Sequence, residues 1–150
     1  MHWRAPGVMR SAAQEADLWR LLTRVRGLRV RRRLRALADA RRRERRAAAA
    51  VAEQAAALEW HAAERQRVLA FCRRDQRAGG QWHATRRAHD AQTPVLQQQL
   101  SDAQHSHAQA RHEAGEALRD WNVERIRHDD ARQRWRAALA RAARDGRERA

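Results

Sequence analysis

The sequence predicts an all-α protein that folds as a long antiparallel two-helix coiled-coil hairpin, and two observations support this. Residues 18–77 contain no proline and a single glycine, Gly27, and they are rich in Ala, Arg, Leu, Glu and Gln, all strong helix formers. Such a helix would be about 90 Å long, far longer than the average helix of a globular domain. Large apolar residues are scarce, with one Phe and no Tyr, so they can fill a narrow seam between two helices but no globular core.

The first helix is expected over residues 11–77, behind a frayed lead-in of residues 1–10. Ser11 and Gln14 are spaced as a capping box, in which each side chain bonds the backbone N–H of the other residue. The apolar residues that follow recur at alternating spacings of three and four, with a change of register where residues 31–33 are all Arg. The side chains expected in this half of the seam are Leu18, Leu21, Val25, Leu28, Leu34, Leu37, Val51, Leu58, Leu69 and Cys72.

Two breaks follow the first helix, and they place the tip of the hairpin within residues 78–93. Gly79 and Gly80 suit the left-handed conformation that commonly ends a helix. Thr93 followed by Pro94 suits the start of a helix, with Thr as the N-cap and Pro in the first helical position. The apex of the hairpin can lie at either break.

The second helix is expected over residues 94–144, with a charged tail at residues 145–150. Trp121 and Trp135 are fourteen residues apart and therefore share one heptad position of its seam. A parallel homodimer with two separate coiled-coil segments is the alternative, and the similar lengths of the two arms favour the hairpin. The seam is expected to comprise Leu100, Ala103, His107, Ala110, Ala114, Ala117, Trp121, Glu124, His128, Ala131, Trp135, Ala138 and Ala142, widened by Leu96, Leu118 and Leu139.

The net charge of +15 comes from 33 basic residues, all Arg, and 18 acidic ones. Residues 20–46 contain thirteen Arg and only two acids, so the basic field lies on the first helix. Consecutive arginines cover every side of a helix, and no aromatic residues are interleaved for base stacking, so an acidic protein surface is the favoured partner and nucleic acid the alternative. The candidate binding residues are Arg41, Arg42, Arg43, Arg45 and Arg46.

The chemistry-bearing residues indicate no catalytic site, no metal and no cofactor, and hence a protein that is not an enzyme. Cys72 is the only cysteine, so it forms no internal disulfide, which fits a reducing compartment. His105, His107 and His112 lack the spacing of three or four that lets two histidines on a helix share a metal. No apolar run reaches the ~20 residues of a membrane span, and no signal peptide is recognisable at the start, so a cytoplasmic location is expected.

Trp60 stands two residues from seam positions on either side and is expected to point away from the seam. An exposed Trp is a common anchor at protein interfaces, so Trp60 is a candidate contact for a partner. The alternative is that the indole lies flat against the side chain of Arg65 or Glu64.

Residues 117–125 read Ala-Leu-Arg-Asp-Trp-Asn-Val-Glu-Arg and lead on to Trp135. They resemble the Ala-Leu-x-x-Trp stretch, followed by a charged segment and another Trp, in the second helix of the central stalk proteins of type III secretion. These are flagellar FliJ and its injectisome counterparts of the YscO and Hrp types, which serve protein transport and, in injectisomes, virulence. The likeness covers the whole chain in architecture and about twenty residues in detail. The Arg-only composition suits an injectisome of a high-GC proteobacterium.

The resemblance implies a non-enzymatic stalk at the cytoplasmic face of the secretion apparatus. Stalks of this family insert into the hexameric export ATPase and link it to the export gate protein, and some also bind secretion chaperones. The paired ends of this chain would enter the ATPase ring, and the tip, with Phe71 and Trp82, would face the export gate. The chain lacks the Tyr residues that some relatives carry near the end of the first helix, so gate-contacting residues are not carried over one by one.

Overall fold

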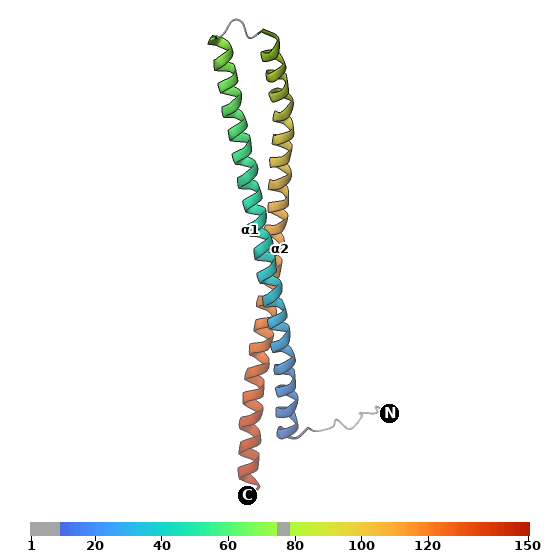
Figure 1. Ribbon diagram of the computed structural model, residues 1–150. Helices are drawn as coiled ribbons and strands as arrows, with labels where there is room; N and C mark the ends of the chain where they lie inside the picture. Colours follow the sequence, from blue (N-terminus) through green and yellow to red (C-terminus); the bar gives the residue numbers. More distant parts are fainter. Residues whose placement is uncertain (1–9, 75–78) are drawn as a thin grey trace, which may run out of the picture. The chain divides into compact units, whose positions relative to one another are not determined.

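The computed structural model describes residues 10–74 and 79–150, which form two long helices packed against each other as a helical hairpin. Helix α1 spans Ala12–Arg74 and helix α2 spans Gly79–Glu148. The all-α hairpin expected from the sequence is therefore confirmed. The chain divides into two compact units, each a segment of α1 lying beside an antiparallel segment of α2 (Figure 1). Unit 1 comprises Met1–Ala38 and Glu116–Ala150, and unit 2 comprises Asp39–Gly115.

The start of α1 has the capping box that its sequence predicts. Ser11 N donates to Gln14 Oε1 over 3.0 Å, and Gln14 N donates to Ser11 Oγ over 3.2 Å. These bonds satisfy two backbone N–H groups that the first turn of a helix leaves without an intrahelical partner.

In unit 1 the helices meet over small side chains. Ala131 and Ala138 of α2 are completely buried, and Ala16 and Thr23 of α1 are buried as well. The buried hydroxyl of Thr23 donates to Trp19 O over 2.7 Å, so burial leaves it hydrogen-bonded. Small residues at these positions let the two backbones approach closely.

One heptad column runs without interruption along α1, and this corrects the predicted seam. The column consists of Ala16, Thr23, Val30, Leu37, Glu44, Val51, Leu58, Arg65 and Cys72, none of which is exposed. No change of register occurs at residues 31–33. Four predicted seam residues are instead exposed, namely Leu21, Val25, Leu28 and Leu34, and the prediction was wrong for them because it followed the largest aliphatic side chains.

The other predicted seam residues lie in or beside the interface, with one exception. Leu37 is buried, while Leu18, Val51, Leu58, Leu69 and Cys72 of α1 and Leu100, Leu118, Trp121 and Trp135 of α2 are half-buried. The exception is Leu139, which is exposed, since the neighbouring Ala138 takes the seam position. Every residue of the predicted α2 heptad series from Leu100 to Ala142 is buried or half-buried.

The predicted tip and the predicted start of the second helix at Pro94 were wrong, because α2 already begins at Gly79. No described glycine has a positive φ, so Gly79 and Gly80 do not adopt the left-handed conformation expected of them. The connection between the helices falls at residues 75–78, which lie outside the described residues, as does the predicted end of the first helix at residues 75–77.

Pro94 lies inside α2 and is exposed. A proline within a helix removes one N–H donor and crowds the carbonyl four residues earlier, which here belongs to Asp90. In the preceding turn the His89 carbonyl accepts a bond from Thr93 Oγ1 over 3.1 Å and lies 3.1 Å from His61 Nε2 of α1. Contacts from both helices therefore hold the turn before the proline in helical form.

The end of α2 also differs from the prediction, since the helix continues to Glu148 and Gly146 does not end it at residue 144. The last turn closes with a bond from Arg149 N to Asp145 O over 3.2 Å. A glycine inside an exposed helix costs only about 1 kcal/mol relative to Ala, which the flanking turns can absorb.

Candidate interaction surfaces

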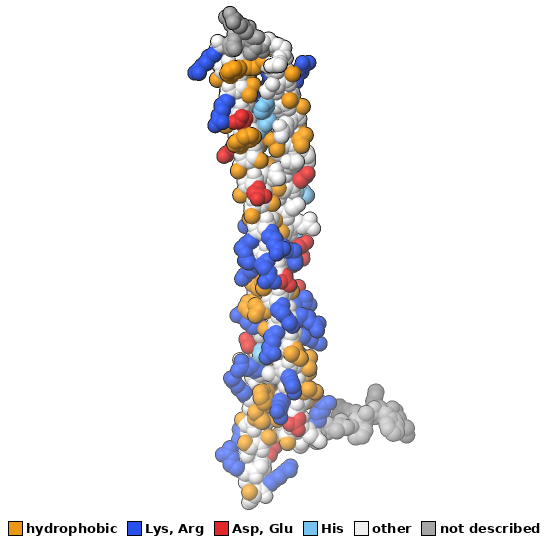
Figure 2. Space-filling model, viewed as in Figure 1, with side chains coloured by type: hydrophobic (Ala, Val, Ile, Leu, Met, Phe, Trp, Pro, Cys, Tyr) orange, Lys and Arg blue, Asp and Glu red, His pale blue; other side chains and the backbone are white. Residues whose placement is uncertain are grey.

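Five arginines near one end of unit 2 form a basic cluster, defined as Arg41, Arg42, Arg43, Arg45 and Arg46. All five are exposed. Arg42 pairs with Asp39 one turn earlier, whereas the other four form no ion pair with any described residue. Within unit 2, basic side chains gather on the viewed face at the end away from the connection between the helices (Figure 2). The cluster presents four uncompensated guanidinium groups that can attract an acidic surface.

Trp60 lies on the outer side of unit 2, as its spacing predicts, and is 66% exposed. The two side chains that could have covered it are engaged elsewhere. Glu64 accepts a 2.6 Å bond from Arg67, and Arg65 Nε lies 3.0 Å from Asp90 Oδ1 of α2. Among the described residues, the indole makes no ring or cation–π contact, so its faces are open to a partner.

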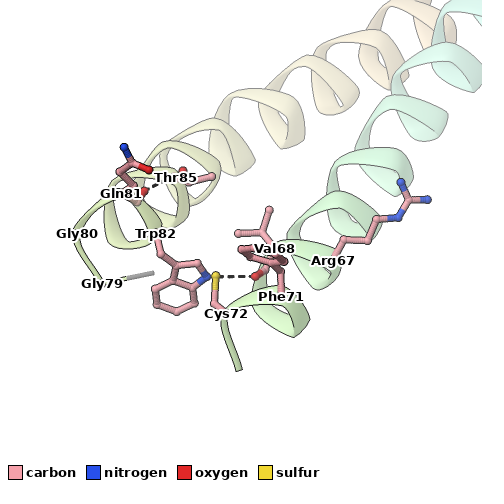
Figure 3. Close-up of a pocket in the computed structure, with 9 residues that line it drawn as sticks. All are labelled: Arg67, Val68, Phe71, Cys72, Gly79, Gly80, Gln81, Trp82 and Thr85. Carbon is pink, nitrogen blue, oxygen red and sulfur yellow. Dashed lines mark hydrogen bonds between the residues drawn. The ribbon is translucent and has the colours of Figure 1, made fainter. Parts of the chain in front are cut away.

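Phe71 and Trp82 come together where the described parts of α1 and α2 end. Trp82 Nε1 donates to Val68 O over 3.1 Å, which fixes the indole against the last turns of α1 (Figure 3). Arg86 lies over the same indole, with its guanidinium carbon 5.7 Å from the ring centroid. Trp82 is thus a half-buried helical residue and not part of a loop, while Phe71 stays 63% exposed.

The same side chains line a cavity of about 470 Å³. The indole of Trp82 and the side chains of Val68, Phe71 and Cys72 point toward one another across it, whereas Arg67 points away (Figure 3). The lining consists of Arg67, Val68, Phe71, Cys72, Gly79, Gly80, Gln81, Trp82 and Thr85. Its apolar character suits the side chain of a docking protein better than a charged ligand.

A polar cluster that the sequence reasoning missed joins the helices of unit 2. We name it the His61 node, and it comprises His61, His89 and Thr93. His61 is buried, and its Nε2 lies 2.9 Å from Thr93 Oγ1 and 3.1 Å from His89 O. The rings of His61 and His89 are tilted, with centroids 5.1 Å apart. Because the His89 carbonyl can only accept, a hydrogen bond from His61 to it requires a proton on Nε2.

Unit 1 contains a second hollow, of about 590 Å³, between its two helix segments. Arg20, Arg24 and Arg31 stand on its α1 side, and Leu28 and Trp135 supply apolar walls. Thr23, Gly27 and His128 complete the lining, so no acidic side chain faces the hollow. The sequence reasoning missed it because Leu28 was assigned to the seam.

The arrangement offers surfaces that a partner could contact within the described ranges. In them no group of three or more His, Cys, Asp or Glu side chains could hold a metal ion. Neither described helix contains a stretch long and apolar enough to cross a membrane. Comparison of the chain with models of protein families, with curated proteins and with solved structures found no match.

Proposed function

We propose that this chain is a non-enzymatic coiled-coil stalk of a type III secretion apparatus. In this role it inserts into the hexameric export ATPase, links it to the export gate at the cytoplasmic face, and also binds chaperones of secreted substrates. The observation that carries the proposal is the helical hairpin of α1 and α2, since a two-helix cross-section with a seam of small residues is what a narrow pore can admit. The resemblance of residues 117–125 to the stalk family adds to it.

The basic cluster supports the same proposal by its lack of partners. Arg41, Arg43, Arg45 and Arg46 form no ion pair with described residues, so their charge is available to an acidic pore lining. Long-range attraction without deep side-chain pockets suits a shaft that must turn or slide inside a ring. Trp60, Phe71 and Trp82 would then serve as contacts beyond the ring.

The experiment that tests the proposal is co-elution of the purified chain with the secretion ATPase of the same genome, at about 0.15 M salt, where the Debye length is about 8 Å. We expect a complex of one chain per ATPase hexamer and an altered rate of ATP hydrolysis. Failure to form a complex at any protein concentration up to that of the cell would refute the stalk.

Nucleic-acid binding is the second candidate, and the same uncompensated arginines favour it. It makes a different prediction about salt, since phosphate contacts by four or five Arg give an affinity that falls steeply as salt rises. An affinity for a random duplex that exceeds the affinity for the ATPase at about 0.15 M salt would favour this alternative.

A further inference from the structure

Three large aliphatic side chains of unit 1 lie on the outside of α1. Leu21, Val25 and Leu28 are 58%, 39% and 57% exposed. Each stands two residues from a seam position, and at about 100° per residue this turns them away from the seam. Leu28 lies at the edge of this outer face, where it also lines the hollow that Trp135 of α2 reaches. The spacing of the three residues by four and three aligns them on one face of the helix, and we name them the outer stripe. We infer that the outer stripe is a docking surface for an acidic amphipathic helix of another protein.

The two faces of α1 differ in a way that indicates a binding role for the exposed aliphatic side chains of the outer stripe. The buried seam positions of this segment, Ala16 and Thr23, carry small side chains, and only some of its aliphatic side chains are half-buried, while those of the outer stripe are exposed. A two-helix protein with few large apolar residues would gain stability by placing them in its seam. Leaving three of them on a single outer face is the pattern of a helix with partners on two sides.

The charges around the outer stripe specify the chemistry of the partner. Residues 20–38 contain eight Arg and no acid. Two of these Arg are engaged with α2, because Arg33 pairs with Asp120 at 3.7 Å and Arg26 donates to Arg127 O. The other six form no ion pair with any described residue, namely Arg20, Arg24, Arg29, Arg31, Arg32 and Arg35.

Five of these six arginines are placed where a docked helix would meet them. Arg20, Arg24 and Arg31 line the hollow of unit 1 beside Leu28, along one edge of the stripe. Arg32 and Arg35 stand one heptad beyond Val25 and Leu28, so charged side chains occupy the next positions on the same face of α1. A partner helix must therefore carry aliphatic residues spaced by three and four, flanked by Glu or Asp, because Arg binds carboxylates bidentately.

The same charges argue against the other possible occupants. A second copy of this chain would bring its own Arg-rich stripe against this one, and like charges repel. A nucleic acid would pair with the arginines but leave the three aliphatic side chains in water. An anionic membrane surface would accept both, but the stripe contains no Trp or Phe of the kind that anchors interfacial helices.

The test uses the full chain and a designed peptide of about 21 residues with Leu at the a and d positions and Glu at the e and g positions of three heptads. Binding is measured by fluorescence anisotropy at about 0.15 M salt, with the peptide dilute enough to remain monomeric. We expect a 1:1 complex that weakens about 100-fold in the triple variant Leu21→Gln/Val25→Gln/Leu28→Gln. The matched control is Val123→Gln/Ile126→Gln, which replaces exposed apolar residues on α2 of the same unit and should bind like the parent.

Four outcomes would overturn the inference. The first is that polyglutamate, which lacks Leu, binds the chain as tightly as the designed peptide does, and the second is that the triple variant binds the peptide as tightly as the parent. The third is that a duplex or anionic vesicles bind the chain more tightly than the peptide does. The fourth is a concentration-dependent dimer of the chain that the triple variant abolishes. Unchanged helicity of the triple variant by circular dichroism ensures that lost binding is not lost folding. This inference does not require the stalk, and the peptide assay and the ATPase co-elution can fail independently.

Discussion

A Cβ atom placed on Gly27 would lie 3.3 Å from Nε2 of His128 on the other helix of unit 1. That distance is tighter than ordinary van der Waals contact, so the glycine allows the two helices to approach closely beside the imidazole. Gly115 differs, because a Cβ placed there would meet nothing within 4 Å. The approach of His128 therefore favours a glycine at position 27, whereas no neighbouring atom opposes a side chain at position 115.

The first prediction compares Gly115→Ala with Gly27→Ala. Gly115→Ala should raise the free energy of unfolding by about 0.5–1 kcal/mol, because Ala is the better helix former and the added methyl meets no obstacle. Gly27→Ala should gain less or lose stability, since His128 must move. Urea denaturation of both variants measures the difference, and an equal gain would show that the Gly27–His128 approach imposes no constraint.

The second prediction concerns Pro94. Replacing it by Ala restores a backbone N–H and removes the crowding at the Asp90 carbonyl, and Pro94 is exposed, so little packing is lost. Pro94→Ala should stabilise the chain by about 1–3 kcal/mol. Val95→Ala, at an exposed neighbouring position, should change stability by about 0.5 kcal/mol or less. A destabilised Pro94→Ala variant would mean that the proline shapes the helix in a way its neighbours require.

The third prediction tests the His61 node. Thr93→Val keeps the shape of the side chain but removes the hydroxyl that contacts His61 and His89, and it should cost about 1–2 kcal/mol. Thr85→Val is the control, because the exposed Thr85 hydroxyl makes the same kind of bond, to Gln81 O, and has no hydrogen bond to the described part of α1. Thermal denaturation should separate the two variants clearly. Equal losses of stability in the two variants would mean that the Thr93 hydroxyl contributes only its bond within α2 and that its contact with His61 adds nothing.

The fourth prediction contrasts two tryptophans. Trp60→Ala should leave the melting temperature almost unchanged, since the side chain is exposed and lacks ring contacts. Trp121→Ala should cost about 2–4 kcal/mol, because Trp121 is half-buried in unit 1 and Arg125 lies over its ring at 5.0 Å. Under the proposed function, Trp60→Ala should weaken a complex with the secretion apparatus despite its intact fold. A large stability loss in Trp60→Ala would contradict the exposed position.

The fifth prediction concerns the basic cluster. Under the proposed function, replacing Arg41, Arg42, Arg43, Arg45 and Arg46 by Gln should weaken ATPase binding and coupling while helicity by circular dichroism stays unchanged. The control removes the same charge elsewhere, by changing to Gln five exposed arginines whose side chains form no described contact, namely Arg111, Arg119, Arg132, Arg136 and Arg149. If both variants lose the same affinity, net charge and not the cluster governs the interaction.

The α2 half of the interface could be predicted from the sequence because two large side chains mark it. Trp121 and Trp135 share a heptad column, and extending that column by sevens finds the buried Ala114 and the half-buried His107, His128 and Ala142. In the first part of α1 the same logic failed, since Leu21, Val25 and Leu28 are exposed and the buried seam positions there are Ala16 and Thr23. Extending the column of Val51 and Leu58 backwards would have found the seam.

Among the candidate surfaces, too, some could be predicted from the sequence and one could not. The exposure of Trp60 follows from its offset to the seam, and the prominence of the basic cluster follows from the run of Arg itself. The His61 node could not be predicted, because it joins residues some thirty positions apart and depends on Pro94 being inside a helix. Single-residue rules treat Thr93-Pro94 as a boundary, whereas contacts from α1 keep the chain helical there.

The His61 node also determines how the two helices of unit 2 align along their length. Where alanine packs against alanine, a slip of one heptad changes the contact little, so those positions have little preference for one alignment. A slip by seven residues would put Gln54 or Val68 opposite Thr93 and move His61 away from its partners. Leaving such a buried polar group unpaired costs about 1–3 kcal/mol. The hydrogen bonds of one buried histidine thus favour a single alignment, together with the Trp82–Val68 bond and the Arg65–Asp90 pair.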